Sequence, residues 1–169
     1  MRIQVIASKP ARQLFPIISW AIRLIEWSKQ SHVTIYFPNQ DIVRHAHFND
    51  IEEVCINKFL EKNKIVNIKN IELTEEQYKK VDTWTKSKIG KQKGYFSTLF
   101  GNLIPQIVRN VFGKIIPNPF TKGLTCSEFV RTALRQADPV WVFVLTNEIP
   151  NGTFTTTDAI HLAEEFNNK

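Results

Sequence analysis

The chain of 169 residues is 43% hydrophobic and 22% charged and carries a net charge of +6, a balance typical of one folded globular domain. This composition excludes a chain that is disordered throughout. The chain has only six glycines, and its eight prolines are scattered, which excludes a collagen. The two cysteines, Cys55 and Cys126, lie far apart and neither belongs to a CxxC motif. This argues against a zinc finger and predicts two free thiols.

The first half of the chain alternates between strand and helix patterns. We expect a strand at 2–7, a helix at 13–29, strands at 33–37 and 42–47, and a strand at 64–71. Turn-forming residues at 38–41 join two of these strands into a hairpin. Because the last three strands follow one another closely, they predict an antiparallel meander.

The second half is mainly helical. A capping box of Thr74 and Gln77 predicts the start of a helix, and Gly90 predicts its end. After it we expect an apolar helical pattern at 95–116, a helix at 126–137, a strand at 140–145 and a final helix from about Thr157. Together these elements predict one α+β domain over 1–169, in which a small antiparallel sheet packs against helices.

Positive charge is concentrated in the middle of the chain, because no Asp or Glu occurs between Asp82 and Glu128. The basic residues of this stretch are Lys86, Lys88, Lys91, Lys93, Arg109, Lys114 and Lys122. They form either a solvated face or a contact surface for an anionic lipid, a cell-wall polymer or a nucleic acid. Since the sequence contains no RNA- or DNA-binding motif, we expect no specific nucleic-acid recognition.

Cys126 is the best candidate for a nucleophile. In the sequence GLTCSEFV (123–130), a glycine-containing loop leads into an amphipathic helix and Cys126 lies in its first turn. Backbone N–H groups and the helix dipole favour a thiolate there, and the amides of Cys126 and Ser127 can hold a developing oxyanion. Ser127 is a weaker nucleophile because no GxSxG motif surrounds it. The alternative is that Cys126 is a small core residue, since it shares a helix face with Val130 and Ala133.

Three of the four histidines lie on the predicted hairpin. His32 opens the first strand, and His45 and His47 share one face of the second. If the strands pair, His32 and His45 lie side by side as a base and a group that orients it. Two other interpretations stay open, namely solvent-exposed histidines and a zinc site formed by all three. His161, in the last predicted helix, is expected to be incidental.

Five segments resemble those of one family. They are SHVTIY (31–36), IVRHA (42–46), GKQKGYF (90–96), TCSEFV (125–130) and TTDA (156–159). In this order they resemble the circularly permuted branch of the NlpC-type papain-like cysteine hydrolase superfamily, which includes YiiX-like and lecithin:retinol acyltransferase-like proteins. The resemblance implies a permuted papain-like fold for the single domain. It covers most of the chain, and the cysteine box and the histidine strand are moderately specific when taken together.

The chain departs from the family pattern in two places. The spacing after His32 is one residue longer than usual, which leaves His45 and His47 in competition for the third polar position. Residues 97–122 read as a helical insertion before the cysteine box, which forms either a lid or a membrane-contacting segment. Substrate preference therefore does not carry over from the family.

The resemblance implies a thiol enzyme. Cys126 would attack a carbonyl carbon, His32 would take the thiol proton and return it to the leaving group, and His45 would orient His32. His47 is the alternative third residue. This chemistry requires no metal and no organic cofactor. We therefore expect a cysteine peptidase or amidase that hydrolyses an amide in a peptidoglycan stem peptide, an isopeptide or a similar substrate.

Two alternatives remain. One is a lipid-directed thiol hydrolase or acyltransferase at a membrane surface, in which the apolar helices at 13–27 and 99–116 and the neighbouring basic residues face the lipid. The other is a binding module without enzymatic activity. The sequence contains no secretory signal and no apolar run long enough to span a membrane, so we expect a cytoplasmic or virion-associated protein.

Overall fold

The computed structural model describes residues 1–11, 23, 29–47, 50–91, 105, 107–109, 111–114, 116, 124–146 and 154–168. Its elements are, in chain order, β1 (Arg2–Pro10), β2 (His32–Phe37), the 3-10 helix η1 (Pro38–Gln40), β3 (Ile42–His47), β4 (Asp50–Cys55), α2 (Ile56–Lys62), β5 (Asn63–Glu72), α3 (Glu75–Lys88), α5 (Cys126–Ala137), α6 (Pro139–Thr146) and α7 (Thr156–Glu165).

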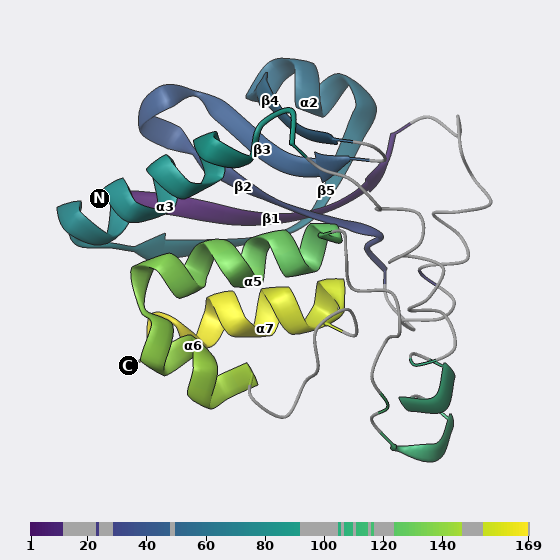
Figure 1. The fold of residues 1–169 in the computed structure, drawn as a ribbon. Helices are drawn as coiled ribbons and strands as arrows, with labels where there is room; N and C mark the ends of the chain where they lie inside the picture. The colour runs from purple at the N-terminus through teal and green to yellow at the C-terminus, as the bar shows by residue number, and fades with distance from the viewer. Residues whose placement is uncertain are drawn as a thin grey trace.

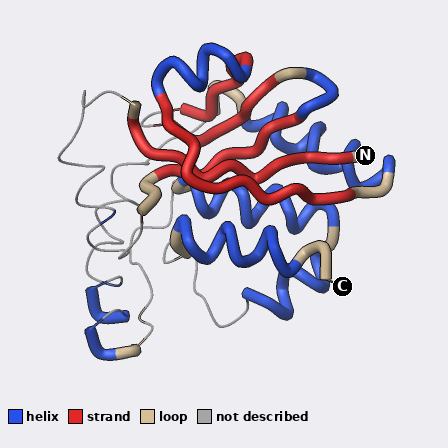
Figure 2. Tube along the Cα trace, turned by 180° about the vertical axis from the view of Figure 1, so that it is seen from behind, coloured by secondary structure: helices blue, strands red, loops and turns tan. Residues whose placement is uncertain are grey.

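The strands form one antiparallel sheet in the order β4-β3-β2-β1-β5. Helices α5 and α7 cover one face, α3 packs beside α5, and α6 packs on α5 (Figure 1). Helix α2 lies on the opposite face, as the view from behind also shows (Figure 2). This arrangement confirms the predicted α+β class with a small antiparallel sheet against helices.

Alternation along the strands divides the apolar residues between two cores. The larger core lies on the side of α5 and α7, where Val33, Ile35 and Phe37 of β2 are fully buried. The smaller core lies beneath α2 and consists of Ile6, Val43 and Phe59. Neighbouring residues of one strand therefore face different helices, which decides where each polar side chain of the site points.

The predicted hairpin is confirmed, with Ile35 opposite Arg44 and Phe37 opposite Ile42. The turn between the strands ends at Asp41, whose φ of 56° lies in the left-handed region that Asp tolerates better than most residues.

The helices at both ends of the second half are confirmed as well. The capping box of Thr74 and Gln77 starts α3, and Gly90 follows its end with a φ of 70°. Helix α5 has the predicted bounds, and α7 starts at its own capping box of Thr155 and Asp158.

The predicted meander is wrong in its third strand. The segment 50–55, which has no strand pattern, forms β4 beside β3, whereas the segment 64–71 forms most of β5 and pairs with β1. The reason is that β4 is stabilised by its partners. Its adjacent glutamates point to opposite faces, and Glu52 and Glu53 lie directly across from His45 and Arg44.

The predicted strand at 140–145 is also wrong, because these residues form α6. Val, Trp and Phe favour strands by propensity, but the preceding Asp138 accepts a hydrogen bond from the Trp141 amide at 3.0 Å and caps the helix. Pro139 occupies the first helical position, where its fixed φ suits a helix. Val142 and Thr146, four positions apart, are the buried residues of the helix.

Several expectations fall on residues outside the described part. They are the helix at 13–29, of which only Arg23 and Lys29 are described, and most of the 95–116 pattern and the 97–122 insertion. Residues 107–109 and 111–112 are helical, and the Gly113 amide donates to the Arg109 carbonyl at 2.9 Å, which ends this turn. Within the described ranges no helix has both the length and the apolar character required to cross a bilayer.

Candidate active site

The structure brings together two of the predicted site residues, His32 and His45. His32 is the first residue of β2 and His45 lies near the end of β3, so both lie toward the same end of the hairpin. The Nε2 atom of His32 is 3.0 Å from the Nδ1 atom of His45, and the two rings meet edge to face. This is a hydrogen bond between two imidazoles, in which one nitrogen donates and the other accepts.

The His45 ring is held firmly and lies on the α2 side of the sheet. It is 6% exposed and contacts the Phe59 ring of α2 edge to face, with centroids 5.7 Å apart. On its other side, its Nε2 atom lies 3.9 Å from a carboxylate oxygen of Glu52, the residue directly across in β4. His45 therefore has a protein group at each ring nitrogen.

Cys126 is the first residue of α5. Thr125 caps this helix, because its side chain accepts a hydrogen bond from the Glu128 amide. Both Cys126 and Cys55 are free thiols, as predicted, but Cys126 is buried and Cys55 is exposed. The position of Cys126 is the one where helix geometry directs unshared N–H groups outward and favours an anion.

The start of α5 and the start of β2 lie at the same end of the molecule, in the front view and from behind (Figures 1 and 2). The two elements also contact each other directly. Cys126 belongs to the larger core, whereas His45 contacts α2 on the other face. Cys126 and the His45 ring therefore lie on opposite faces of the sheet.

The first turn of α5 is tied to the start of α7. The Ser127 hydroxyl donates to the Phe154 carbonyl and lies 3.1 Å from the Thr125 hydroxyl. Phe154 directly precedes Thr155, the cap of α7. The Ser127 hydroxyl thus connects the first turns of α5 and α7. Because the hydroxyl is used in this contact, any contribution of Ser127 to an oxyanion site would come from its backbone amide.

A buried ion pair that the sequence analysis missed lies just behind Cys126. Glu128 and Arg131, one helical turn apart, form an ion pair at 2.6 Å, and the Arg131 guanidinium lies 4.8 Å from the centre of the Phe154 ring. Burial lowers the pKa of Arg131, and the charge of Glu128 opposes this effect. The Glu-x-x-Arg spacing was the available signal, because residues three apart are neighbours on a helix.

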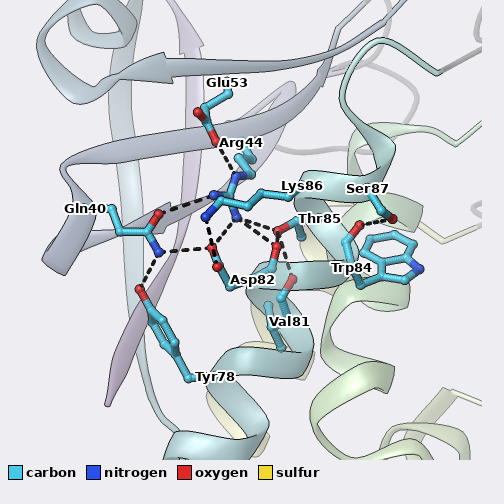
Figure 3. A network of polar contacts seen from close by, with 10 residues as sticks. All are labelled: Gln40, Arg44, Glu53, Tyr78, Val81, Asp82, Trp84, Thr85, Lys86 and Ser87. Atoms are coloured by element: carbon cyan, nitrogen blue, oxygen red, sulfur yellow. Dashed lines mark hydrogen bonds and ion pairs between the residues drawn. The ribbon is translucent and has the colours of Figure 1, made fainter.

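A second missed residue, Arg44, holds β3 in place next to His45. Its side chain is fully buried and contacts Glu53 and Asp82 at 2.7 Å each and Thr85 at 2.8 Å (Figure 3). These contacts attach β3 to β4 and α3. Because Arg44 points toward α3 and His45 toward α2, the network lies on the opposite face of the sheet from the histidine pair.

The remaining candidates lie elsewhere. The side chain of His47 falls outside the described part, and its backbone pairs with Asp50. His161 is exposed on α7. Among the residues that the structure describes, no group of three or more His, Cys, Asp or Glu side chains is arranged to hold a metal ion.

In comparisons with known proteins, no family model, no curated protein and no solved structure matches this chain. The resemblance to the permuted NlpC-type superfamily therefore stays a prediction from the sequence.

Proposed function

We propose that this protein is a thiol-dependent hydrolase that cleaves an amide bond through an acyl-enzyme on Cys126, with His32 as the base and His45 as its orienting partner. The observation that carries the proposal is the hydrogen bond between His32 Nε2 and His45 Nδ1. A base whose second nitrogen is held by another group is the arrangement that nucleophilic catalysis requires.

In the proposed mechanism the two nitrogens of His32 have different roles. Because Nε2 faces His45, Nδ1 is the atom that takes the Cys126 proton. The resulting imidazolium donates from Nε2 to the lone pair of His45 Nδ1, so the positive charge on His32 is stabilised. Thiolate and imidazolium form together, and no other base is needed.

The reaction then follows acyl-transfer chemistry. The thiolate forms a bond to the carbonyl carbon, and the oxyanion is held by the amides at the start of α5. The C–N bond breaks as the amine takes the proton from His32. Water attacks the thioester, His32 accepts a proton from it, and the acid is released with the Cys126 thiol restored. A peptide, such as a peptidoglycan stem peptide or an isopeptide, is the substrate class that we favour.

A lipid-directed thiol hydrolase or acyltransferase is the second candidate. It uses the same cysteine and histidines but releases the acyl group from a lipid ester or amide to water, an amine or an alcohol. The observation in its favour is an exposed apolar cluster on the helical turn before Gly113. Ile107, Val111 and Phe112 are 47%, 62% and 68% exposed, and Lys114 lies two positions after Phe112. Apolar side chains beside cations suit an anionic lipid surface.

Thiol reactivity tests the proposal directly. Iodoacetamide labelling of Cys126 is measured against pH by peptide mass spectrometry, with the exposed Cys55 as the internal standard for an ordinary thiol. We expect Cys126 to label with a midpoint below about 8.5, and His32→Ala to raise this midpoint to at least the ordinary value. His161→Ala, which changes an exposed histidine on α7, should leave the profile unchanged.

A second measurement separates a reactive thiol from a catalytic one. Amide and ester acyl probes should add one acyl group to the intact protein, and the added mass should disappear in Cys126→Ser. Circular dichroism verifies that each variant is folded. Labelling of Cys126 that is unaffected by His32→Ala, together with the absence of any acyl adduct, would overturn the proposal and favour a binding module.

A further inference from the structure

We infer that Glu52 is a positioning residue for the proposed active site, which selects the tautomer of His45 that can accept a hydrogen bond from His32. This inference rests on the proposed function and extends it by a fourth residue. Glu52 does not touch the reacting atoms, since it acts through His45 and His32.

The register of the sheet places Glu52 beside His45. The two residues are direct cross-strand partners of β3 and β4, and the carboxylate oxygen lies 3.9 Å from His45 Nε2. Val54, two residues further along β4, packs into the core under α2, so Glu52 points to this same face. Glu53 points to the other face, where it binds Arg44. The two glutamates thus serve two different networks.

The directions of the hydrogen bonds give Glu52 its role. For His32 Nε2 to donate to His45 Nδ1, Nδ1 must be unprotonated and the proton of His45 must be on Nε2. A carboxylate near Nε2 favours that tautomer and stabilises the positive charge that arises on the histidine pair when Cys126 loses its proton. The distance of 3.9 Å makes this a charge contact, since a direct hydrogen bond is shorter.

Among the described residues, the other groups near His45 have different roles from that of Glu52. From α2, the ring contact is with the uncharged Phe59, and the charged residues of that helix, Lys58, Glu61 and Lys62, are exposed to solvent. Asp50 lies on the same face of β4, but its carboxylate accepts the Ile51 amide and it pairs in register with His47. Within the described part of the chain, Glu52 is thus the carboxylate placed at His45 Nε2.

The test compares Glu52→Gln with Glu53→Gln, which removes the same charge from the next position of β4. We expect Glu52→Gln to raise the pH midpoint of Cys126 labelling and to slow labelling at pH 7 by roughly two- to fivefold, the effect of one partly exposed charge contact. Glu52→Asp should restore part of the rate. Glu53→Gln should lower the melting temperature, because it takes a partner from Arg44, and leave the midpoint unchanged.

Nitrogen NMR of the histidine rings gives a readout that does not depend on activity. In the wild type at neutral pH, His45 should be protonated at Nε2, and Glu52→Gln should increase the fraction protonated at Nδ1. If Cys126 responds to His32→Ala but Glu52→Gln changes neither the midpoint nor the tautomer, the inference about Glu52 is overturned and the proposed function stands. If the tautomer changes but Cys126 behaves as an ordinary thiol, Glu52 positions His45 and the proposed function fails.

Discussion

Arg44 is fully buried, and its burial requires partners for its charge and its N–H groups. Removing a guanidinium from water costs several kcal/mol unless its charge and its donors are satisfied. Here two carboxylates, Glu53 and Asp82, each contact it at 2.7 Å, and its guanidinium lies 4.5 Å from the centre of the Phe37 ring. The cluster thereby attaches β3, the strand of His45, to α3.

Asp82 makes this network dependent on pH. Burial by itself raises the pKa of this carboxyl, but hydrogen bonds from Arg44, Gln40 and Lys86 and the charge of Arg44 outweigh it and hold the pKa below its ordinary value of 3.8. A pKa that is lower in the folded state stabilises the fold above the ordinary value. This contribution is lost as the pH falls through the lower, folded-state value.

We therefore expect Asp82→Asn to lower the free energy of unfolding at pH 7 by about 2 kcal/mol, since it removes a charged partner from a buried cation. The difference from wild type should shrink as the pH falls below 3.8, where the carboxyl of the unfolded chain becomes protonated, and should vanish only below the lower folded-state pKa, where the folded carboxyl is neutral as well. Urea unfolding followed by circular dichroism at several pH values measures this. Glu76→Gln, which removes an exposed pair with Lys80, is the control and should cause no measurable change. A difference that is constant over the whole pH range would contradict the assignment.

At the scale of elements, side chains at the first turns decide where the helices begin. Thr155 and Asp158 form a capping box, with the Asp158 amide donating to the Thr155 hydroxyl at 3.0 Å and the Thr155 amide donating to Asp158 at 2.8 Å. Asp158 also accepts two hydrogen bonds from Arg109, at 2.8 and 3.0 Å. The start of α7 is thus attached both to α5, through Ser127, and to the turn at 107–109.

Thr155→Ala should lower the free energy of unfolding by about 1 kcal/mol, the usual cost of removing a capping hydroxyl. Thr155→Ser keeps the hydroxyl and should retain most of the stability. The matched control is Thr157→Ala, because Thr157 lies in the same turn but is exposed. Urea unfolding compares the three variants, and equal effects of Thr155→Ala and Thr157→Ala would refute a specific capping role.

At the scale of the molecule, the concentrated positive charge is partly neutralised by folding. Lys86 pairs with Asp82, Lys88 lies over the Trp84 ring, and Arg109 binds Asp158, so three of the predicted surface cations have partners within the chain. Lys93 and Lys122 lie outside the described residues. The net charge of +6 remains, and with it a general attraction to anionic surfaces.

If the lipid-directed function is correct, this net charge and the exposed apolar cluster of Ile107, Val111 and Phe112 predict that the protein binds anionic vesicles. Co-sedimentation with vesicles containing phosphatidylglycerol should exceed that with phosphatidylcholine alone and should weaken as salt is added. Val111→Ser combined with Phe112→Ser should reduce it. A matched pair on α6, Val140→Ser with Phe143→Ser, removes equally exposed apolar residues. An equal loss of vesicle binding in both double variants would indicate nonspecific hydrophobic adsorption. If the wild type does not bind vesicles, the peptide substrate is the better proposal.

Local patterns in the sequence were sufficient for the elements that depend on neighbours along the chain. The hairpin of β2 and β3, the capping box of α3 and the helix that begins at Cys126 were all predicted from spacings of a few residues. The groups that stabilise these elements lie within one helical turn or on either side of one hairpin loop. Because they are close in the sequence, they can be predicted from it. The strand predicted at 140–145 is wrong because the helix start at Asp138 and Pro139 overrides the strand propensity of the apolar residues that follow.

Long-range pairing was decided only by the tertiary structure. The sequence does not predict that 64–71 pairs with β1, that Glu52 lies across from His45, or that Arg44 forms an ion pair with Asp82 of α3. The histidine pair is different, because the predicted hairpin already placed His32 and His45 side by side, with His47 as the alternative, and the structure gives their distance of 3.0 Å. The physical reason is that a strand needs a partner for its backbone hydrogen bonds and a buried charge needs a counter-charge, and both come from segments distant in the sequence.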